Sequence, residues 1–127
     1  MTRTAKGGKR ADLGFYCRSA WEANTARYLA WLQKHGKVAA WAYEPDIFRF
    51  EGVKRNPISY TPDFKVTYPD GRWEYWEVKG WFNSESRSKL ARMAKFFPTV
   101  PIKVIDKQEY EAISRWRSLI PNWETGE

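Results

Sequence analysis

Residues 59–81 read SYTPDFKVTYPDGRWEYWEVKGW, and this stretch decides the fold. Aromatic and β-branched residues, which favour β-strands, are frequent over residues 59–68 and 72–81. The Pro-Asp-Gly at 69–71 is typical of a tight turn, because proline presets one φ angle and glycine supplies a positive one. We therefore predict a hairpin closed at this turn. Bulky residues on both faces of its second strand indicate a central place in the sheet.

The predicted hairpin brings three charged side chains together. Alternate residues of a strand share one face, so Glu77 and Lys79 point the same way. Pairing of the two strands places Asp63, fourteen positions before Glu77, beside them. Two carboxylates and one ammonium group on a common face make a candidate site for a hard cation, with a neighbouring group that handles protons.

The whole chain is basic and has the length of one domain. Its 127 residues include 22 Lys and Arg against 15 Asp and Glu, which leaves a formal net charge of +7. This excess, with a sequence pI near 9.6, favours a polyanionic partner such as nucleic acid, although small basic proteins also serve other functions. The eight Trp suit base stacking or a subunit interface as well as a core.

Cysteine and histidine usage excludes several kinds of site. Cys17 is the only cysteine, so neither an intrachain disulfide nor a cysteine-based zinc site is expected. His35 is the only histidine, which excludes mechanisms that need two imidazoles. Since we find no apolar run of the length of a membrane span or signal peptide, we expect a cytoplasmic protein.

The rest of the chain predicts alternating helices and strands. Ser19 and Glu22 form a capping-box pattern that opens a helix, and Gly36 ends it. A later helix, stopped by Pro98, is expected to bury a stripe of Leu90, Ala94 and Phe97. The expected elements are a mobile basic arm over residues 1–14, a helix from 19 to 36, an extended edge segment over 41–50, the two hairpin strands, a helix over 84–97, a strand over 102–105 and a helix over 107–119. This order indicates an α/β fold, a mixed sheet flanked by helices.

The charged residues of the hairpin suit phosphodiester hydrolysis. Mg²⁺ prefers oxygen ligands and is usually held by one or two carboxylates together with water and substrate phosphate. Asp63 and Glu77 are therefore the expected direct ligands, with the backbone carbonyl of Val78 as a third. Lys79 is expected to orient or activate the attacking water. Glu22, on the first helix, is expected to hold a second ion or to position a water.

Each of these residues also has a simpler interpretation. An isolated Glu-Val-Lys on a strand is usually a solvated ion pair. An Asp that follows a proline, as Asp63 follows Pro62, often only stabilises a turn. Glu22 shares a helix face with Leu29 and can look inward, or it can simply close the capping box of Ser19. Taken together, however, inward-facing acids in a basic chain are hard to explain as packing, because buried carboxylates are costly unless paired or bound to a cation.

Glu22, Pro62-Asp63 and Glu77-Val78-Lys79 resemble the signature of the PD-(D/E)XK nucleases. The similarity is closest to the phage-type endonuclease I group of Holliday junction resolvases and covers roughly residues 15–106. The matching blocks are FYCRS at 15–19, YEP at 43–45, YTPDF at 60–64, EVKGW at 77–81 and the basic helix that follows.

The resemblance implies a restriction-endonuclease-like domain over residues 15–127. It also implies a Mg²⁺-dependent, structure-selective endonuclease of branched DNA that leaves 5′-phosphate ends, with Mn²⁺ able to substitute. Resolvases of this group act as homodimers, often with exchanged N-terminal elements, and a phage-encoded member would work in the host cytoplasm. A nickase or restriction-like nuclease of ordinary DNA, and a DNA-binding module without catalysis, remain as alternatives.

Basic residues flanking the expected site are candidate contacts to DNA phosphates. They lie in the N-terminal segment and on the helix after the hairpin: Arg3, Lys6, Lys9, Arg10, Arg18, Arg87, Lys89, Arg92 and Lys95. No signature of base-specific readout is visible, so we expect recognition of DNA shape.

Overall fold

The structure is a computed structural model that describes residues 7–125. Its centre is a mixed four-stranded sheet in the order β3-β6-β7-β8, in which β8 alone runs parallel to its neighbour. The strands are β3 (Ala40–Tyr43), β6 (Phe64–Thr67), β7 (Trp73–Val78) and β8 (Ile102–Ile105). The α/β class is confirmed, and β7 has a strand on either side, as its bulky residues predicted.

The β6–β7 hairpin closes at the predicted turn. Phe64 pairs with Trp76, and the N–H of Gly71 donates to the carbonyl oxygen of Tyr68 at 2.9 Å. Gly71 has a φ of 92°, which glycine adopts without a steric cost. The turn chemistry and the strand pairing therefore agree, and they fix the register of the hairpin.

The single strand expected over residues 59–68 is two strands. β5 (Ser59–Tyr60) and β6 are separated by residues 61–63, where Pro62 has no N–H to give to a ladder. β5 instead pairs with β4 (Phe48–Arg49) in a two-stranded ladder of its own. The break places Asp63 directly before the start of β6.

Three α-helices flank the sheet, and none of the described helices is long and apolar enough to cross a membrane. They are α1 (Ala20–Lys34), α2 (Ser84–Phe96) and α3 (Lys107–Ser114). Ser19 caps α1 as predicted, because its Oγ accepts the N–H of Glu22 at 3.1 Å. The last helix is shorter than expected, since the chain continues from α3 into a 3₁₀ turn, η1 (Arg117–Leu119).

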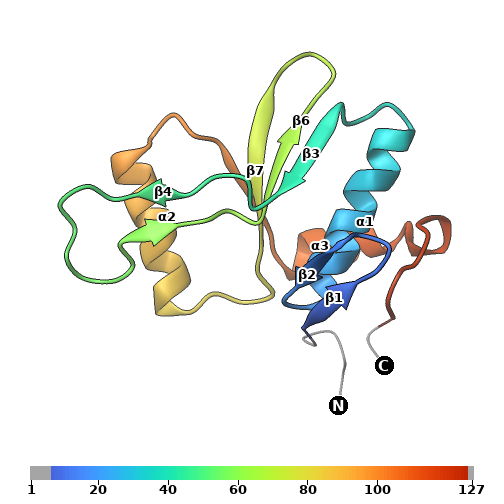
Figure 1. The fold of residues 1–127 in the computed structure, drawn as a ribbon, viewed down its shortest axis with the longest axis horizontal. Coiled ribbons are helices and arrows are strands. Elements are labelled where there is room, and N and C mark those ends of the chain that lie inside the picture. Colours follow the sequence, from blue (N-terminus) through green and yellow to red (C-terminus); the bar gives the residue numbers. More distant parts are fainter. Residues whose placement is uncertain (1–6, 126–127) are drawn as a thin grey trace.

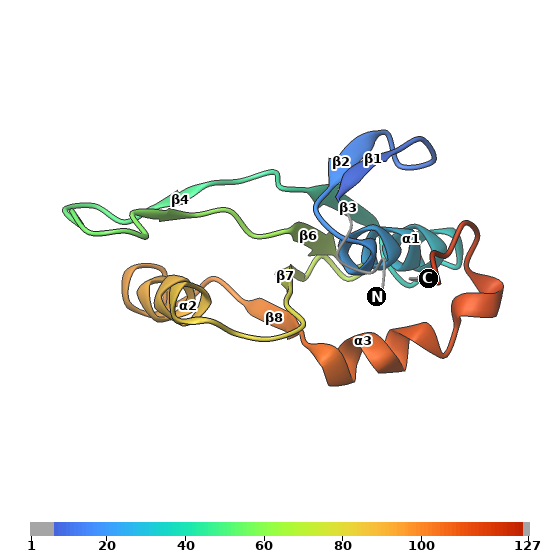
Figure 2. The same cartoon turned by 90° about the horizontal axis from the view of Figure 1, so that it is seen from below.

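Two hydrophobic clusters hold these elements together. Helices α1 and α3 pack on one face of the sheet, where Leu29 and Ile113 meet Phe64 and Trp76. A second cluster, around Phe50, Tyr60 and Met93, packs α2 against the segment of β4 and β5. Figures 1 and 2 show α2 beside β4, away from α1 and α3. Leu90 and Phe97 pack against the cluster of buried Met93, as predicted for α2, whereas Ala94 is exposed, so that part of the prediction is wrong.

Residues 8–17 form a hairpin against α1. β1 (Gly8–Arg10) pairs with β2 (Phe15–Cys17), and Gly14, with a φ of 83°, closes the turn between them. The sequence predicted a mobile arm over residues 1–14. Residues 8–10 form a strand instead, and Arg10 at its end pairs with Glu124 at 2.8 Å. Residues 1–6, which include Arg3 and Lys6, lie outside the described residues.

Candidate active site

A cavity of about 680 Å³ lies where the N-terminal end of α1 meets the ends of β6 and β7. All four residues predicted to be catalytic line it, with one of the predicted phosphate-binding lysines and Arg18. Its lining consists of Arg18, Ser19, Glu22, Glu44, Ser59, Thr61, Asp63, Glu77, Val78, Lys79 and Lys89. Residues separated by more than 50 positions in the chain therefore share one hollow.

Three carboxylates stand in a row across the ends of neighbouring strands. Tyr43 pairs with Phe64, and Phe64 pairs with Trp76, so the adjacent positions align Glu44, Asp63 and Glu77. The N–H of Glu44 donates to the backbone carbonyl of Asp63 at 2.8 Å, which continues the β3–β6 ladder by one residue. The sheet thus gathers acidic side chains at one end.

Asp63 is the most strongly perturbed group of the row. It is buried, and its Oδ2 accepts the N–H of Val78 at 2.7 Å. Burial raises the pKa of Asp63 well above the usual range, and the nearby carboxylates of Glu77 and Glu22 add to that rise. The ionised form of Asp63 is therefore costly in this site.

Glu77 is buried beside it and is held by a tyrosine. The Tyr60 hydroxyl donates to Glu77 Oε1 at 2.7 Å. Burial raises the pKa of Glu77, while the Tyr60 hydrogen bond and the charge of Lys79 oppose that rise. Tyr60 was not predicted as a site residue, although it belongs to the same YTPDF block as Asp63.

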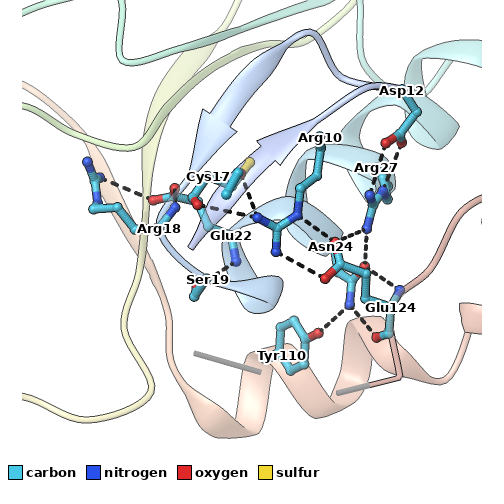
Figure 3. A network of polar contacts seen from close by, with 11 residues as sticks. Arg10, Asp12, Cys17, Arg18, Ser19, Glu22, Asn24, Arg27, Tyr110 and Glu124 are labelled. Atoms are coloured by element: carbon cyan, nitrogen blue, oxygen red, sulfur yellow. Dashed lines mark hydrogen bonds and ion pairs between the residues drawn. The ribbon is translucent and has the colours of Figure 1, made fainter. Parts of the chain in front are cut away.

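Glu22 combines the two roles that the sequence left open. Its Oε1 accepts the backbone N–H of Arg18 at 2.8 Å and the hydroxyl of Tyr43 at 2.9 Å. The return bond of the capping box thus goes to the residue before Ser19, as Figure 3 shows for the start of α1. The carboxylate is also buried and lines the cavity, so capping and a place in the site are compatible.

Arg18 is the cation that faces these acids. Its Nη2 lies 2.7 Å from Glu44 Oε2, 2.9 Å from Asp63 Oδ1 and 3.1 Å from Glu22 Oε2. The sequence predicted a phosphate contact at Arg18, whereas the structure places its guanidinium on three carboxylates. Glu44 was missed as a site residue. Its backbone φ of 48°, unusual for a residue with a side chain, is not visible in a sequence.

Lys79 and Lys89 supply further positive charge at the cavity. Lys79 directly follows β7, where its backbone N–H donates to the carbonyl of Ile105 at 3.0 Å. Lys89 comes from α2. Within residues 7–125 neither lysine forms a salt bridge. Both ammonium groups are therefore available to an anion that enters the cavity.

The other predicted phosphate contacts divide into two groups. Lys9, Arg87 and Lys95 are exposed. Arg10 and Arg92 instead hold protein groups, since Arg10 binds Glu124 and Arg92 donates to the carbonyl oxygens of Arg55 and Pro57. Sequence reasoning could not separate these groups, because basic residues on a surface have the same signature whether or not a protein acceptor lies nearby.

The donor set fits a hard divalent cation. Within residues 7–125 no cluster of three or more His, Cys, Asp or Glu side chains is gathered as a metal site. Magnesium sites need fewer, since one or two carboxylates are typical. Asp63 and Glu77 offer buried oxygen ligands, and burial raises the pKa of both, so their ionised forms are costly unless a cation compensates them.

Comparisons with protein-family models, with curated proteins and with solved structures found no match to this chain.

Proposed function

We propose that this protein is a Mg²⁺-dependent endonuclease that hydrolyses phosphodiester bonds of branched DNA and leaves 5′-phosphate ends. The observation that carries the proposal is the pair of buried carboxylates, Asp63 and Glu77, in a cavity that Lys79 and Lys89 also line. Buried acids are expensive to keep unless a cation compensates them. Lys79 and Lys89, which form no salt bridge within residues 7–125, suit the phosphate that such a cation would also bind.

Asp63 and Glu77 are the side chains that would hold Mg²⁺, or Mn²⁺ in its place, with the Val78 carbonyl as a third oxygen. A bound ion would neutralise charge that develops on the phosphate and would make an attacking water more acidic. Glu22, buried at the start of α1, would hold a second ion or position a water. The Tyr60 hydroxyl fixes the rotamer of Glu77 through its hydrogen bond.

Lys79 is the proposed partner of the attacked phosphate. It follows β7 directly, so the sheet fixes its backbone close to Glu77. Its ammonium group would bind a phosphate oxygen and orient or activate the attacking water. Lys89 would bind a neighbouring phosphate from α2.

Branched DNA as the substrate follows from the resemblance to the junction resolvases, and the net charge of +7 favours a polyanion of any shape. Cutting a four-way junction on two strands needs two active sites, which supports a homodimer with or without exchanged N-terminal elements. The alternatives are a nickase or restriction-like nuclease of ordinary DNA, and a DNA-binding module whose acids only hold the fold.

One assay separates these possibilities. A labelled four-way junction, a linear duplex and a single strand of matched sequence are incubated with the protein, each with Mg²⁺ and with chelator. The proposal expects Mg²⁺-dependent cutting of the junction and little cutting of the others. Equal cutting of all three substrates would indicate a general nuclease without a preference for branched DNA. Tight DNA binding without metal-dependent cutting would identify the binding module.

A further inference from the structure

We propose that Arg18 is a resident counter-ion of the acid site, which a divalent cation displaces and which then binds the DNA phosphate next to the metal. This inference rests on the proposed nuclease function and assigns Arg18 a part in it. Arg18 thereby links metal loading to DNA binding.

The contacts of Arg18 are concentrated on a single atom. Nη2 makes all three ion pairs, to Glu22, Glu44 and Asp63. Within residues 7–125, Nε and Nη1 donate no hydrogen bond. Nη2 therefore neutralises the acids, while the other donors of the guanidinium fork, Nε and Nη1, are unused within residues 7–125. That fork matches the geometry of a phosphate, which arginine binds through two parallel N–H donors.

The acids are buried and therefore fixed, whereas the side chain of Arg18 is exposed and can move. The side chain of Arg18 is 57% exposed, whereas those of Glu22 and Asp63 are 5% and 3% exposed. Arg18 also precedes Ser19, the N-cap, so it lies outside α1. Its side chain can swing toward solvent without breaking the helix, while the carboxylates stay in place.

A divalent cation and Arg18 compete for the same acid. Arg18 lies 2.9 Å from Asp63 Oδ1, and Asp63 is one of the two carboxylates proposed to hold the metal. A metal ion at this carboxylate repels the guanidinium, and a phosphate beside the metal attracts it. Because coupling between two ligands is reciprocal, DNA that captures Arg18 should strengthen metal binding, and the metal should strengthen DNA binding.

Calorimetric titration with Ca²⁺, an oxygen-preferring ion, tests this competition. Ca²⁺ alone should bind Arg18→Ala more tightly than the native chain, because the competitor is gone. The expected gain lies within about 5- to 150-fold, the usual range of coupling between sites. Adding an uncut four-way junction should raise the Ca²⁺ affinity of the native chain and raise that of Arg18→Ala much less. Unchanged or weaker Ca²⁺ binding by Arg18→Ala would overturn the inference.

Two further variants keep the result interpretable. Arg72→Ala removes the same charge from an exposed pair with Asp70 in the β6–β7 turn, so it controls for net charge and should leave Ca²⁺ binding unchanged. Arg18→Met keeps the apolar stem and replaces the alanine variant if thermal denaturation shows that the latter does not fold. Failure of the proposed function looks different, since neither the native chain nor the variant would then bind Ca²⁺, with or without the junction.

Discussion

Two arginine–carboxylate networks meet at α1, and they differ in charge balance. Figure 3 shows the first network, together with Arg18 and Glu22 of the second. In the first, Arg27 pairs with Asp12 at 2.9 Å and with Glu124 at 2.8 Å, and Arg10 also pairs with Glu124 at 2.8 Å. Two cations thus meet two acids. The hydrogen bonds from Arg27 and Arg10 hold the pKa of Asp12 and of Glu124, respectively, below their usual values. We call this group the clasp, since it ties the N-terminal hairpin and the C-terminal segment to α1.

The second network, at the cavity, is unbalanced. Arg18 pairs with Glu22, Glu44 and Asp63, and among the described residues that line the cavity four acids face three cations, because Glu77, Lys79 and Lys89 lie there too. The pKa of Asp63 is raised because burial and neighbouring acids outweigh the arginine. A balanced network stabilises a fold, whereas a buried excess of one charge costs stability and is typical of a binding or catalytic site.

The largest expected effect is on cleavage. Asp63→Asn removes a proposed metal ligand and should lower Mg²⁺-dependent junction cleavage by about 10³-fold, since several kcal/mol of charge stabilisation are lost and each 1.36 kcal/mol is a factor of about ten. The fold should survive, because the change removes a repelled charge. Cleavage and thermal denaturation are measured on the same preparation. Asp12→Asn, in the clasp, is the matched control and should cut normally once folded. Full activity of Asp63→Asn would remove Asp63 from the mechanism.

The next effect is on stability. Arg27 is buried, and Arg27→Ala leaves Asp12 without its cation and Glu124 with Arg10 only, so it should lower the free energy of unfolding by about 2–4 kcal/mol. Urea denaturation measures this loss. Arg72→Ala breaks an exposed pair, with side chains 71% and 58% exposed, and should leave the urea midpoint close to that of the native chain. Similar losses for the two variants would contradict the structural role given to the clasp.

The pH dependence of stability should have opposite signs in the two networks. The pKa of Asp63 is raised from 3.8, so its stabilising contribution is complete below that value and is lost as pH rises through the folded-state pKa. The pKa values of Asp12 and Glu124 are lowered from 3.8 and 4.5, so their contributions are present above those values and are lost as pH falls.

Urea denaturation in chelator, from about pH 3 to about pH 8, tests this sign for Asp63. Asp63→Asn should gain stability relative to the native chain as pH rises, with a slope of at most about 1.4 kcal/mol per pH unit for one proton. Parallel curves for the two proteins would mean that Asp63 is not perturbed in the folded chain.

The same contrast explains what the sequence could reveal. The hairpin with Asp63 and Glu77 was predictable, because turn residues and strand alternation are local signals. The place of β7 inside the sheet was also predictable, from bulky residues on both faces. Those local signals were enough to name Asp63 and Glu77 among the acids that line the cavity.

Arginine partners were not predictable, because they depend on contacts distant in sequence. Arg10 meets Glu124 across 114 positions, so nothing local distinguishes it from a phosphate-binding arginine. Glu44 joins the site only through the alignment of β3 with β6. The split of the strand at Pro62 did have a local signal, because proline removes a hydrogen-bond donor from the ladder. The aromatic residues around Pro62 outweighed that signal in the prediction of one continuous strand.

The smallest expected effect is on the reactivity of Cys17. The thiol is fully buried on β2, and burial raises its pKa from 9.0 to about 11, which lowers the thiolate fraction about a hundredfold. Alkylation in the native chain therefore requires the N-terminal hairpin to open. Glu124→Gln weakens the clasp that restrains this hairpin and should speed alkylation about fivefold, as expected for about 1 kcal/mol.

Glu44→Gln is the matched change in the unbalanced network. It removes one of three acids from Arg18 and leaves the contacts of Arg10 intact, so the alkylation rate of Cys17 should stay close to that of the native chain. Iodoacetamide labelling followed by mass spectrometry measures both variants at one pH. If Glu44→Gln accelerated labelling as much as Glu124→Gln, the two networks would open together. The division between a structural clasp and a separate acid site would then be wrong.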